Sequence, residues 1–104
     1  MPGPSEAEFL RQILQLARLR GWRVAHFRAA GTAAGWRTPC QADAAGFPDL
    51  VLCRGKRLLW VEVKTDGGRL RGEQTLWLRA LQAAGQTAIV WQPSMCKEIE
   101  AALL

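Results

Sequence analysis

Residues 46–64 read GFPDLVLCRGKRLLWVEVK, in which two apolar runs flank the polar turn Arg54-Gly55-Lys56. The runs, 48–53 and 57–64, have strand length and are rich in leucine, valine and tryptophan, so the pair predicts a β-hairpin. Apolar residues follow one another in both runs instead of alternating with polar ones, which is typical of strands buried on both faces. We therefore expect other elements to cover both sides of this hairpin.

The segments around the hairpin predict further helices and strands. Helical spacing of apolar residues indicates helices over 5–20 and 72–84, a weaker pattern indicates a short one over 94–103, and strands are expected at 22–28 and 87–91. The apolar side of the 72–84 helix is expected to hold Leu76, Trp77, Ala80, Leu81 and Ala84. The order α-β-β-β-α-β-α, with a helical crossover between two strands, predicts an α/β fold whose mixed sheet is flanked by helices.

Residues 29–47 differ from the rest because Ala, Gly, Thr and Pro dominate and no period is visible. We expect a long, mobile loop here, which is uncommon inside a compact domain and is often functional. The length of 104 residues and the hydrophobic content of 49% suit one core. Residues 1–104 are therefore expected to form a single domain.

The formal net charge is +5, from 14 Lys and Arg against 9 Asp and Glu, and 11 of the cations are Arg. Arginine binds phosphate in a bidentate fork, so this bias favours a polyanionic partner, although a GC-rich genome would produce the same bias. The three cysteines are scattered, which argues against a disulfide framework and predicts buried thiols in a reducing compartment. With neither an apolar run of about 18 residues nor a signal peptide, we expect a cytoplasmic, intracellular protein.

Charged residues gather at the ends of the two buried strands. Residues i and i+2 of a strand share a face, so Glu62 and Lys64 point the same way, and the turn carries Asp49 back opposite Glu62. Buried charges need an opposite charge or a metal ion. A salt bridge at the sheet end would satisfy Glu62 and Lys64 alone, but the addition of Asp49 favours a metal site.

The residue types suit phosphodiester hydrolysis. That reaction needs a hard cation to neutralise developing charge and to lower the pKa of a water molecule. Mg²⁺ takes oxygen ligands and keeps several waters, so Asp49 and Glu62, with the Val63 carbonyl as a third ligand, are a sufficient set. Lys64 is placed to orient or deprotonate the attacking water and to stabilise the transition state.

Pro48-Asp49 followed by Glu62-Val63-Lys64 resembles the PD-(D/E)xK nuclease motif, and the wider pattern is similar to the VRR-NUC domain. The matching stretches are 5–9, 21–22, His26, 46–51, 62–64, 68–70, 73–74 with Trp77, and 91–94. The resemblance implies a restriction-endonuclease-like αβββαβ core and a nuclease that depends on Mg²⁺ or Mn²⁺ and acts on branched DNA. Stand-alone members of this size resemble phage and bacterial proteins, some of which act as dimers on Holliday junctions.

Carried over residue by residue, the resemblance makes Asp49 and Glu62 metal ligands and Lys64 the catalytic lysine. Gln74 resembles a residue that helps hold the metal or the phosphate; the alternative is a solvated residue in a helix turn. The family also places an acid on the first helix. Helical phase puts Glu6 within about 60° of the buried stripe and turns Glu8 to solvent, so Glu6 is our metal-site acid, unless both are ordinary first-turn acids.

Six further residues are candidates for DNA contact. His26 and Arg28 share a strand face and could reach the scissile phosphate, although a hydrogen-bonded core histidine is the favoured alternative for His26. Trp36 either stacks on an unpaired base or packs the loop onto the domain. The arginines predicted to bind backbone phosphates, or else to be plain surface charges, are Arg28, Arg37, Arg69 and Arg71.

These readings together predict a Mg²⁺-dependent DNA endonuclease, selective for branched DNA such as Holliday junctions or flaps. The main alternative is a non-catalytic DNA-binding module that retains the nuclease fold, and a third is a basic protein that binds an acidic protein partner. So small a domain covers few base pairs, and cutting a junction needs two coordinated incisions. We therefore expect a two-fold homodimer.

Overall fold

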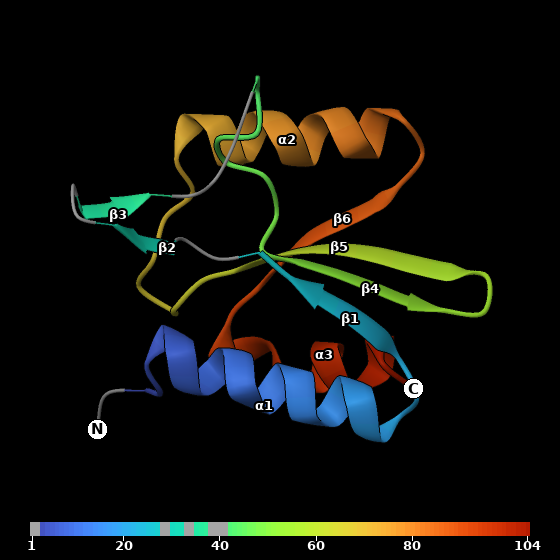
Figure 1. Cartoon of the computed structure of the whole chain (residues 1–104). Coiled ribbons are helices and arrows are strands. Elements are labelled where there is room, and N and C mark those ends of the chain that lie inside the picture. Colours follow the sequence, from blue (N-terminus) through green and yellow to red (C-terminus); the bar gives the residue numbers. More distant parts are fainter. Residues whose placement is uncertain (1–2, 28–29, 33–34, 38–41) are drawn as a thin grey trace.

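The computed structural model describes residues 3–27, 30–32, 35–37 and 42–104 (Figure 1). Its elements, in chain order, are α1 (Glu6–Leu19), β1 (Arg23–His26), β2 (Ala30–Thr32), β3 (Gly35–Arg37), β4 (Leu50–Arg54), β5 (Arg57–Val63), α2 (Gly72–Ala83), β6 (Thr87–Trp91), the 3₁₀ turn η1 (Pro93–Met95) and α3 (Cys96–Ala102). None of the helices in these ranges is long and apolar enough to cross a lipid bilayer.

The main sheet of the described chain has four strands in the order β1-β4-β5-β6. The β1–β4 and β4–β5 pairs are antiparallel, and β5–β6 is parallel because α2 carries the chain back across the sheet. Helix α2 lies on one face of the sheet, and α1 and α3 lie on the other (Figure 1). The predicted α/β fold, a mixed sheet flanked by helices, is therefore confirmed.

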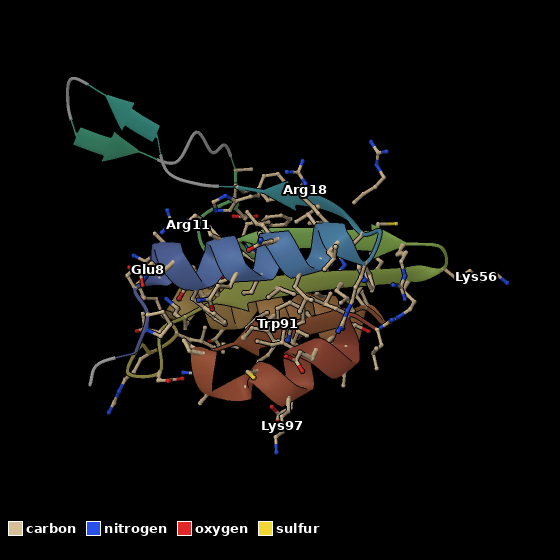
Figure 2. All side chains as sticks on the ribbon, turned by 90° about the horizontal axis from the view of Figure 1, so that it is seen from below. Glu8, Arg11, Arg18, Lys56, Trp91 and Lys97 are labelled. Carbon is tan, nitrogen blue, oxygen red and sulfur yellow. The ribbon has the colours of Figure 1, made fainter. Side chains whose placement is uncertain are left out.

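The main core lies between the sheet and the α1–α3 layer. From α1 it receives Phe9, Ile13 and Ala17, which recur every fourth residue and form one buried stripe. Ser5 caps this helix as predicted, since its hydroxyl accepts a hydrogen bond from the Glu8 backbone N–H at 3.1 Å. Figure 2 looks onto this layer and shows Trp91 in its middle, with Lys56 at the far tip of the β4–β5 turn.

A two-stranded antiparallel sheet, β2–β3, stands inside the segment 29–47, where the sequence predicted only a loop. Each strand has three residues, too few for a period of two to be visible in the sequence. The rest of the loop prediction falls partly on residues 28–29, 33–34 and 38–41, which lie outside the described residues.

Helix α2 turns a different side to the sheet from the one predicted. Leu76 is 69% exposed and Ala80 is also exposed, whereas Gln74 and Leu78 are buried. The predicted apolar side holds for the half-buried Trp77 and Leu81 and is wrong for the exposed Leu76, Ala80 and Ala84. It also left out Gln74, a polar residue that is buried with a hydrogen bond to Glu62. Hydrophobic periodicity cannot identify such a residue.

Two of the three cysteines contradict the prediction of buried thiols. Cys53 and Cys96 are free and exposed, while Cys40 lies outside the described residues. Cys53 is on β4, between the buried Leu52 and the β4–β5 turn, and strand alternation directs it away from the core face.

Candidate active site at the end of the β4–β5 pair

Asp49 directly precedes β4 and lies across from Glu62 on β5. The register pairs Leu50 with Val61, and one further step pairs Asp49 with Glu62. The Oδ2 atom of Asp49 accepts a hydrogen bond from the Val63 backbone N–H at 2.9 Å, and its carbonyl accepts one from the Phe27 N–H at 2.8 Å. Asp49 is thus fixed between β1 and β5 by both its side chain and its backbone.

Glu62 is only 2% exposed and receives a hydrogen bond from α2. Its Oε1 accepts from the Gln74 Nε2 at 3.1 Å. The other end of the same amide is also used, since the Gln74 Oε1 accepts from the Arg71 backbone N–H at 2.8 Å. Gln74 therefore holds one orientation, with its NH₂ group directed at Glu62, and the solvated alternative for this residue is wrong.

The pKa of Glu62 reports how closely the two carboxyl groups meet. The pKa is raised from 4.5 to about 8, mainly by burial and also by the hydrogen bond to Asp49 and the negative charge of Asp49. The Lys64 ammonium acts in the opposite direction, while Glu6 adds a smaller upward effect. Without a cation, the Glu62 carboxyl therefore keeps its proton near neutral pH and shares it with Asp49.

This donor set suits a hard divalent cation. Two carboxyl groups face each other beside the β5 backbone at Val63, and oxygen donors are what Mg²⁺ prefers. No three His, Cys, Asp or Glu side chains in the described ranges lie close enough to hold one metal ion. The fit therefore rests on two carboxylates, a number that suffices for Mg²⁺ because it keeps several of its waters.

Lys64 and Glu6 lie at the edge of the acidic pair. The half-buried Lys64 directly follows β5. Its backbone N–H donates to the Trp91 carbonyl at 3.0 Å, which holds the Lys64 backbone beside the end of β6. Glu6 is exposed in the first turn of α1, near enough for its charge to act on the pKa of Glu62 but not to complete a three-carboxylate group. Glu8 is exposed as well.

The structure does not bring the remaining predicted residues into the acidic pair. His26 pairs with Leu50 in the β1–β4 ladder, so strand alternation places it on the α1 face, opposite to the Asp49 carboxylate. Arg69 and Arg71 are exposed on the segment that leads from β5 to Gln74. Arg28 lies outside the described residues, as do the side chains of Trp36 and Arg37.

Gly46 and Phe47 lead into Asp49 and position it, a role that the sequence pattern alone did not predict. Gly46 has φ +79°, and a Cβ at this residue would lie 2.5–2.7 Å from the Glu73 and Gln74 atoms that open α2. Only glycine allows so close an approach at this φ. A glycine directly before an aromatic residue and Pro-Asp was the signal available in the sequence.

Phe47 anchors the same segment through three edge-to-face contacts. Its ring centroid lies 5.6 Å from that of Phe27, 5.7 Å from that of Trp60 and 5.0 Å from that of Trp77. Aromatic pairs at this distance and angle add to the stability gained by burial alone. Gly46 and Phe47 therefore fix the Asp49 backbone against α2 and the sheet.

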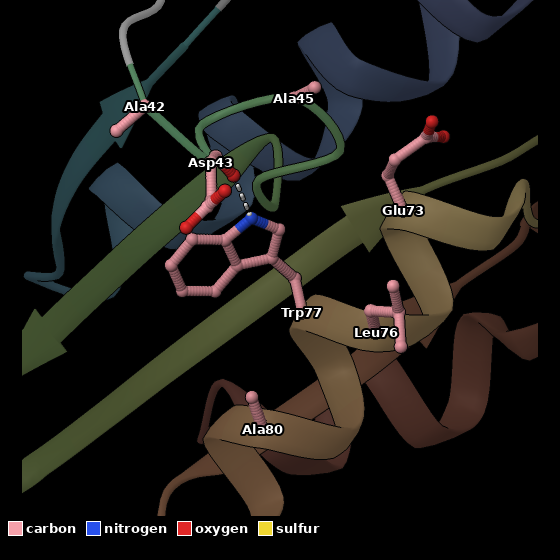
Figure 3. Close-up of a pocket in the computed structure, with 7 residues that line it drawn as sticks. All are labelled: Ala42, Asp43, Ala45, Glu73, Leu76, Trp77 and Ala80. Atoms are coloured by element: carbon pink, nitrogen blue, oxygen red, sulfur yellow. Dashed lines mark hydrogen bonds between the residues drawn. The ribbon is translucent and has the colours of Figure 1, made fainter.

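A separate pocket of about 450 Å³ lies between α2 and the segment 42–45 (Figure 3). Its lining residues are Ala42, Asp43, Ala45, Glu73, Leu76, Trp77 and Ala80. The Trp77 indole N–H donates to the Asp43 carbonyl at 2.7 Å, which joins the loop to the helix within the pocket lining. Neither Asp49 nor Glu62 lines it, so the pocket is not part of the candidate metal site.

The sequence profile of the VRR-NUC domain matches residues 32–94, more than half of the chain. The chain belongs to the VRR-NUC domain family. The matched region contains Asp49, Glu62, Lys64 and Gln74, so the whole acidic pair and its supporting residues fall within the VRR-NUC domain. The family is one of nucleases, which makes this chain a nuclease domain.

A solved structure with a similar fold is that of Hjc, a Holliday junction resolvase from the archaeal hyperthermophile Archaeoglobus fulgidus. The likeness covers 83% of this chain and 67% of the resolvase, with 23% sequence identity and a TM-score of 0.50. At this identity the likeness shows that the VRR-NUC domain has a resolvase-like nuclease fold. No curated protein sequence matches the chain.

Proposed function

We propose that this VRR-NUC domain is a DNA endonuclease that uses Mg²⁺ or Mn²⁺ to hydrolyse phosphodiester bonds in branched DNA such as Holliday junctions or flaps. The observation that carries the proposal is the meeting of Asp49 and the buried Glu62 across the β4–β5 pair, with Gln74 and Lys64 beside them. The substrate class is supported by the fold, which resembles that of a protein described as a Holliday junction resolvase.

Asp49 and Glu62, with the Val63 carbonyl, would hold the divalent ion. The negative charge of Glu6, on α1, would also attract it. When bound, the ion lowers the pKa of a water molecule and neutralises charge on the phosphate. Gln74 keeps the Glu62 carboxylate in one orientation through its Nε2 atom. The Lys64 Nζ orients the attacking water, accepts its proton or stabilises the charge that develops on the phosphate.

DNA binding is assigned to cations that lie around this end of the sheet. Arg69 and Arg71 are exposed beside the first turn of α2, where backbone phosphates flanking the cut would pass. Arg28 and Arg37 remain candidates for phosphate contact, and Trp36 remains a candidate for stacking. His26 is the weaker candidate, because the register turns it to the α1 face. The net charge of +5 favours the same partner.

Removal of the Asp49 carboxylate tests the enzyme. Plasmid, single-stranded, flap and four-way-junction DNA are incubated with protein in Mg²⁺, Mn²⁺ or EDTA. We expect metal-dependent cleavage of branched DNA by the wild type and a loss of at least about 100-fold in Asp49→Ala. Asp43→Ala is the matched control, because Asp43 is an exposed aspartate outside the acidic pair, and it should cleave normally.

The alternative is a DNA-binding module that retains the fold without catalysis. It predicts that the wild type binds branched DNA with or without metal and leaves every substrate intact. Cleavage that persists equally in Asp49→Ala would instead show that the Asp49 carboxylate takes no part in it. Both results would overturn the proposed role of Asp49 and Glu62.

A further inference from the structure

Phe27 is an exposed aromatic residue at the edge of the acidic pair. It directly follows β1 and is 48% exposed, whereas Phe47, Trp60 and Trp77 are each partly covered. Its backbone N–H donates to the Asp49 carbonyl at 2.8 Å, which continues the β1–β4 ladder and pairs Phe27 with Asp49. Residues directly opposite in a ladder project on the same face with Cβ atoms about 5 Å apart. The Phe27 ring therefore stands beside the Asp49 carboxylate.

The ring is held in place on one side and open on the other. Its centroid lies 5.6 Å from that of Phe47 at an interplanar angle of 76°, and Phe47 is itself packed against Trp60 and Trp77. This chain of contacts fixes the position of the ring without covering it. An open aromatic surface loses the stabilisation that burial would give, so a ligand that covers it would gain that stabilisation.

We propose that Phe27 stacks on an unpaired nucleobase next to the phosphate that is cut, an inference that rests on the proposed nuclease function. In an intact duplex the faces of the bases are covered by their neighbours, and only base edges are open in the grooves. A protein ring beside the scissile phosphate can therefore meet a base face only where the strand is unpaired or branched. Phe27 thus gives the domain a physical reason to prefer flaps and junctions to plain duplex.

A fluorescent adenine analogue that is quenched by stacking provides the direct test. It is placed beside the branch point of a flap, in the matching single strand and in the fully paired duplex, and protein is added in EDTA. We expect quenching and tight binding with the flap and the single strand for the wild type and Phe27→Trp. In Phe27→Ala we expect the quenching to disappear and binding to these two DNAs to weaken about ten-fold.

Leu19→Ala is the matched control, because Leu19 is a large apolar residue, 83% exposed, at the opposite end of α1 from the site. It should quench and bind as the wild type does. Equal quenching and equal affinity in wild type and Phe27→Ala would overturn the proposal, as would a loss of affinity of the same size for paired duplex.

Cleavage kinetics separate this proposal from the proposed function. For Phe27→Ala we expect a higher KM on flap DNA and an unchanged KM on any duplex that is cut, with Phe27→Trp restoring the flap value. Flap cleavage with unaltered KM in Phe27→Ala would overturn the role of Phe27 and leave the nuclease intact. Quenching that depends on Phe27 without any cleavage would overturn the nuclease and leave stacking intact, and a wild type that does neither would overturn both.

Discussion

At the scale of single residues, Glu62 makes the stability of the domain depend on pH. Its pKa is about 8 in the folded protein and 4.5 in an exposed chain. Between these values the folded state keeps a proton that the unfolded chain has released, so the free energy of unfolding must fall as pH rises. The contribution is complete below pH 4.5 and is lost as pH passes about 8, provided that no cation replaces the proton.

Glu62→Gln should remove this dependence, because an amide fills the same space and does not titrate. In EDTA, we expect the wild type to lose about 2–4 kcal/mol of unfolding free energy between pH 5 and pH 8.5 relative to Glu62→Gln. Urea unfolding at both pH values measures the difference, with the exposed Glu73→Gln as control. Parallel pH profiles for wild type and Glu62→Gln would contradict the raised pKa of Glu62.

The acidic pair and Lys64 were predictable from local rules, whereas the face of His26 and the contact of Gln74 with Glu62 were not. Alternation along β5 and the short turn at Gly55 bring Asp49 opposite Glu62, and both rules are local. The face taken by His26 depends on the β1–β4 register, and a shift of one residue would reverse it. The bond from Gln74 to Glu62 joins α2 to β5, so no local pattern contains it.

At the scale of elements, the position of Asp49 depends on how the preceding loop packs on α2. The Gly46 backbone lies against Glu73 and Gln74, and the same first turn of α2 carries the amide that binds Glu62. A change at this contact therefore displaces both carboxyl groups relative to each other. The loop acts as a positioning element for the site.

Gly46→Ala should damage both stability and activity. A Cβ there has to move helix backbone, because the nearest atoms are 2.5–2.7 Å away, and it also meets the strain of φ +79°. Gly85→Ala is a close control, since Gly85 has φ +82° but nothing within 4 Å of its Cβ position. We expect Gly85→Ala to cost about 1 kcal/mol and Gly46→Ala about 1–3 kcal/mol more.

Thermal or urea unfolding measures these costs, and cleavage of flap DNA measures the second effect. Gly46→Ala should lose most of its activity even at temperatures where it is fully folded, whereas folded Gly85→Ala should keep it. Equal costs and equal activities for the two variants would mean that the contact with α2 does not position Asp49.

The elements themselves were largely predictable, and the exceptions have physical reasons. Each of the α1, β4, β5 and β6 segments carries a buried pattern of its own, so its type follows from the sequence. The β2 and β3 strands are too short for a pattern. The buried side of α2 includes the polar Gln74, which hydrophobicity does not identify, and the predicted apolar side included the exposed Leu76.

For the whole molecule, topology decides where the site lies. The antiparallel β4–β5 pair brings the start of β4 to the end of β5. The parallel β5–β6 pair brings the end of β6 to the same end of the sheet. The first turns of α1 and α2 also lie toward this end of the sheet (Figure 1). Carboxylates, the Lys64 amine and the Gln74 amide therefore converge although they are far apart in the sequence. This convergence follows from the predicted α-β-β-β-α-β order, in which one crossover is helical.

Assembly is the remaining property at this scale. One acidic pair per chain provides one incision, whereas resolving a four-way junction needs two cuts placed symmetrically, so we expect two chains related by a two-fold axis to act together. Light scattering at micromolar concentrations should give the mass of a dimer.

A cruciform plasmid provides the functional measurement, because paired cuts yield linear DNA and single cuts yield nicked circles. Wild type should produce linear DNA, and an equimolar mixture with Asp49→Ala should shift the product toward nicked circles. A monomeric mass with linear product retained in the mixture would contradict the dimer.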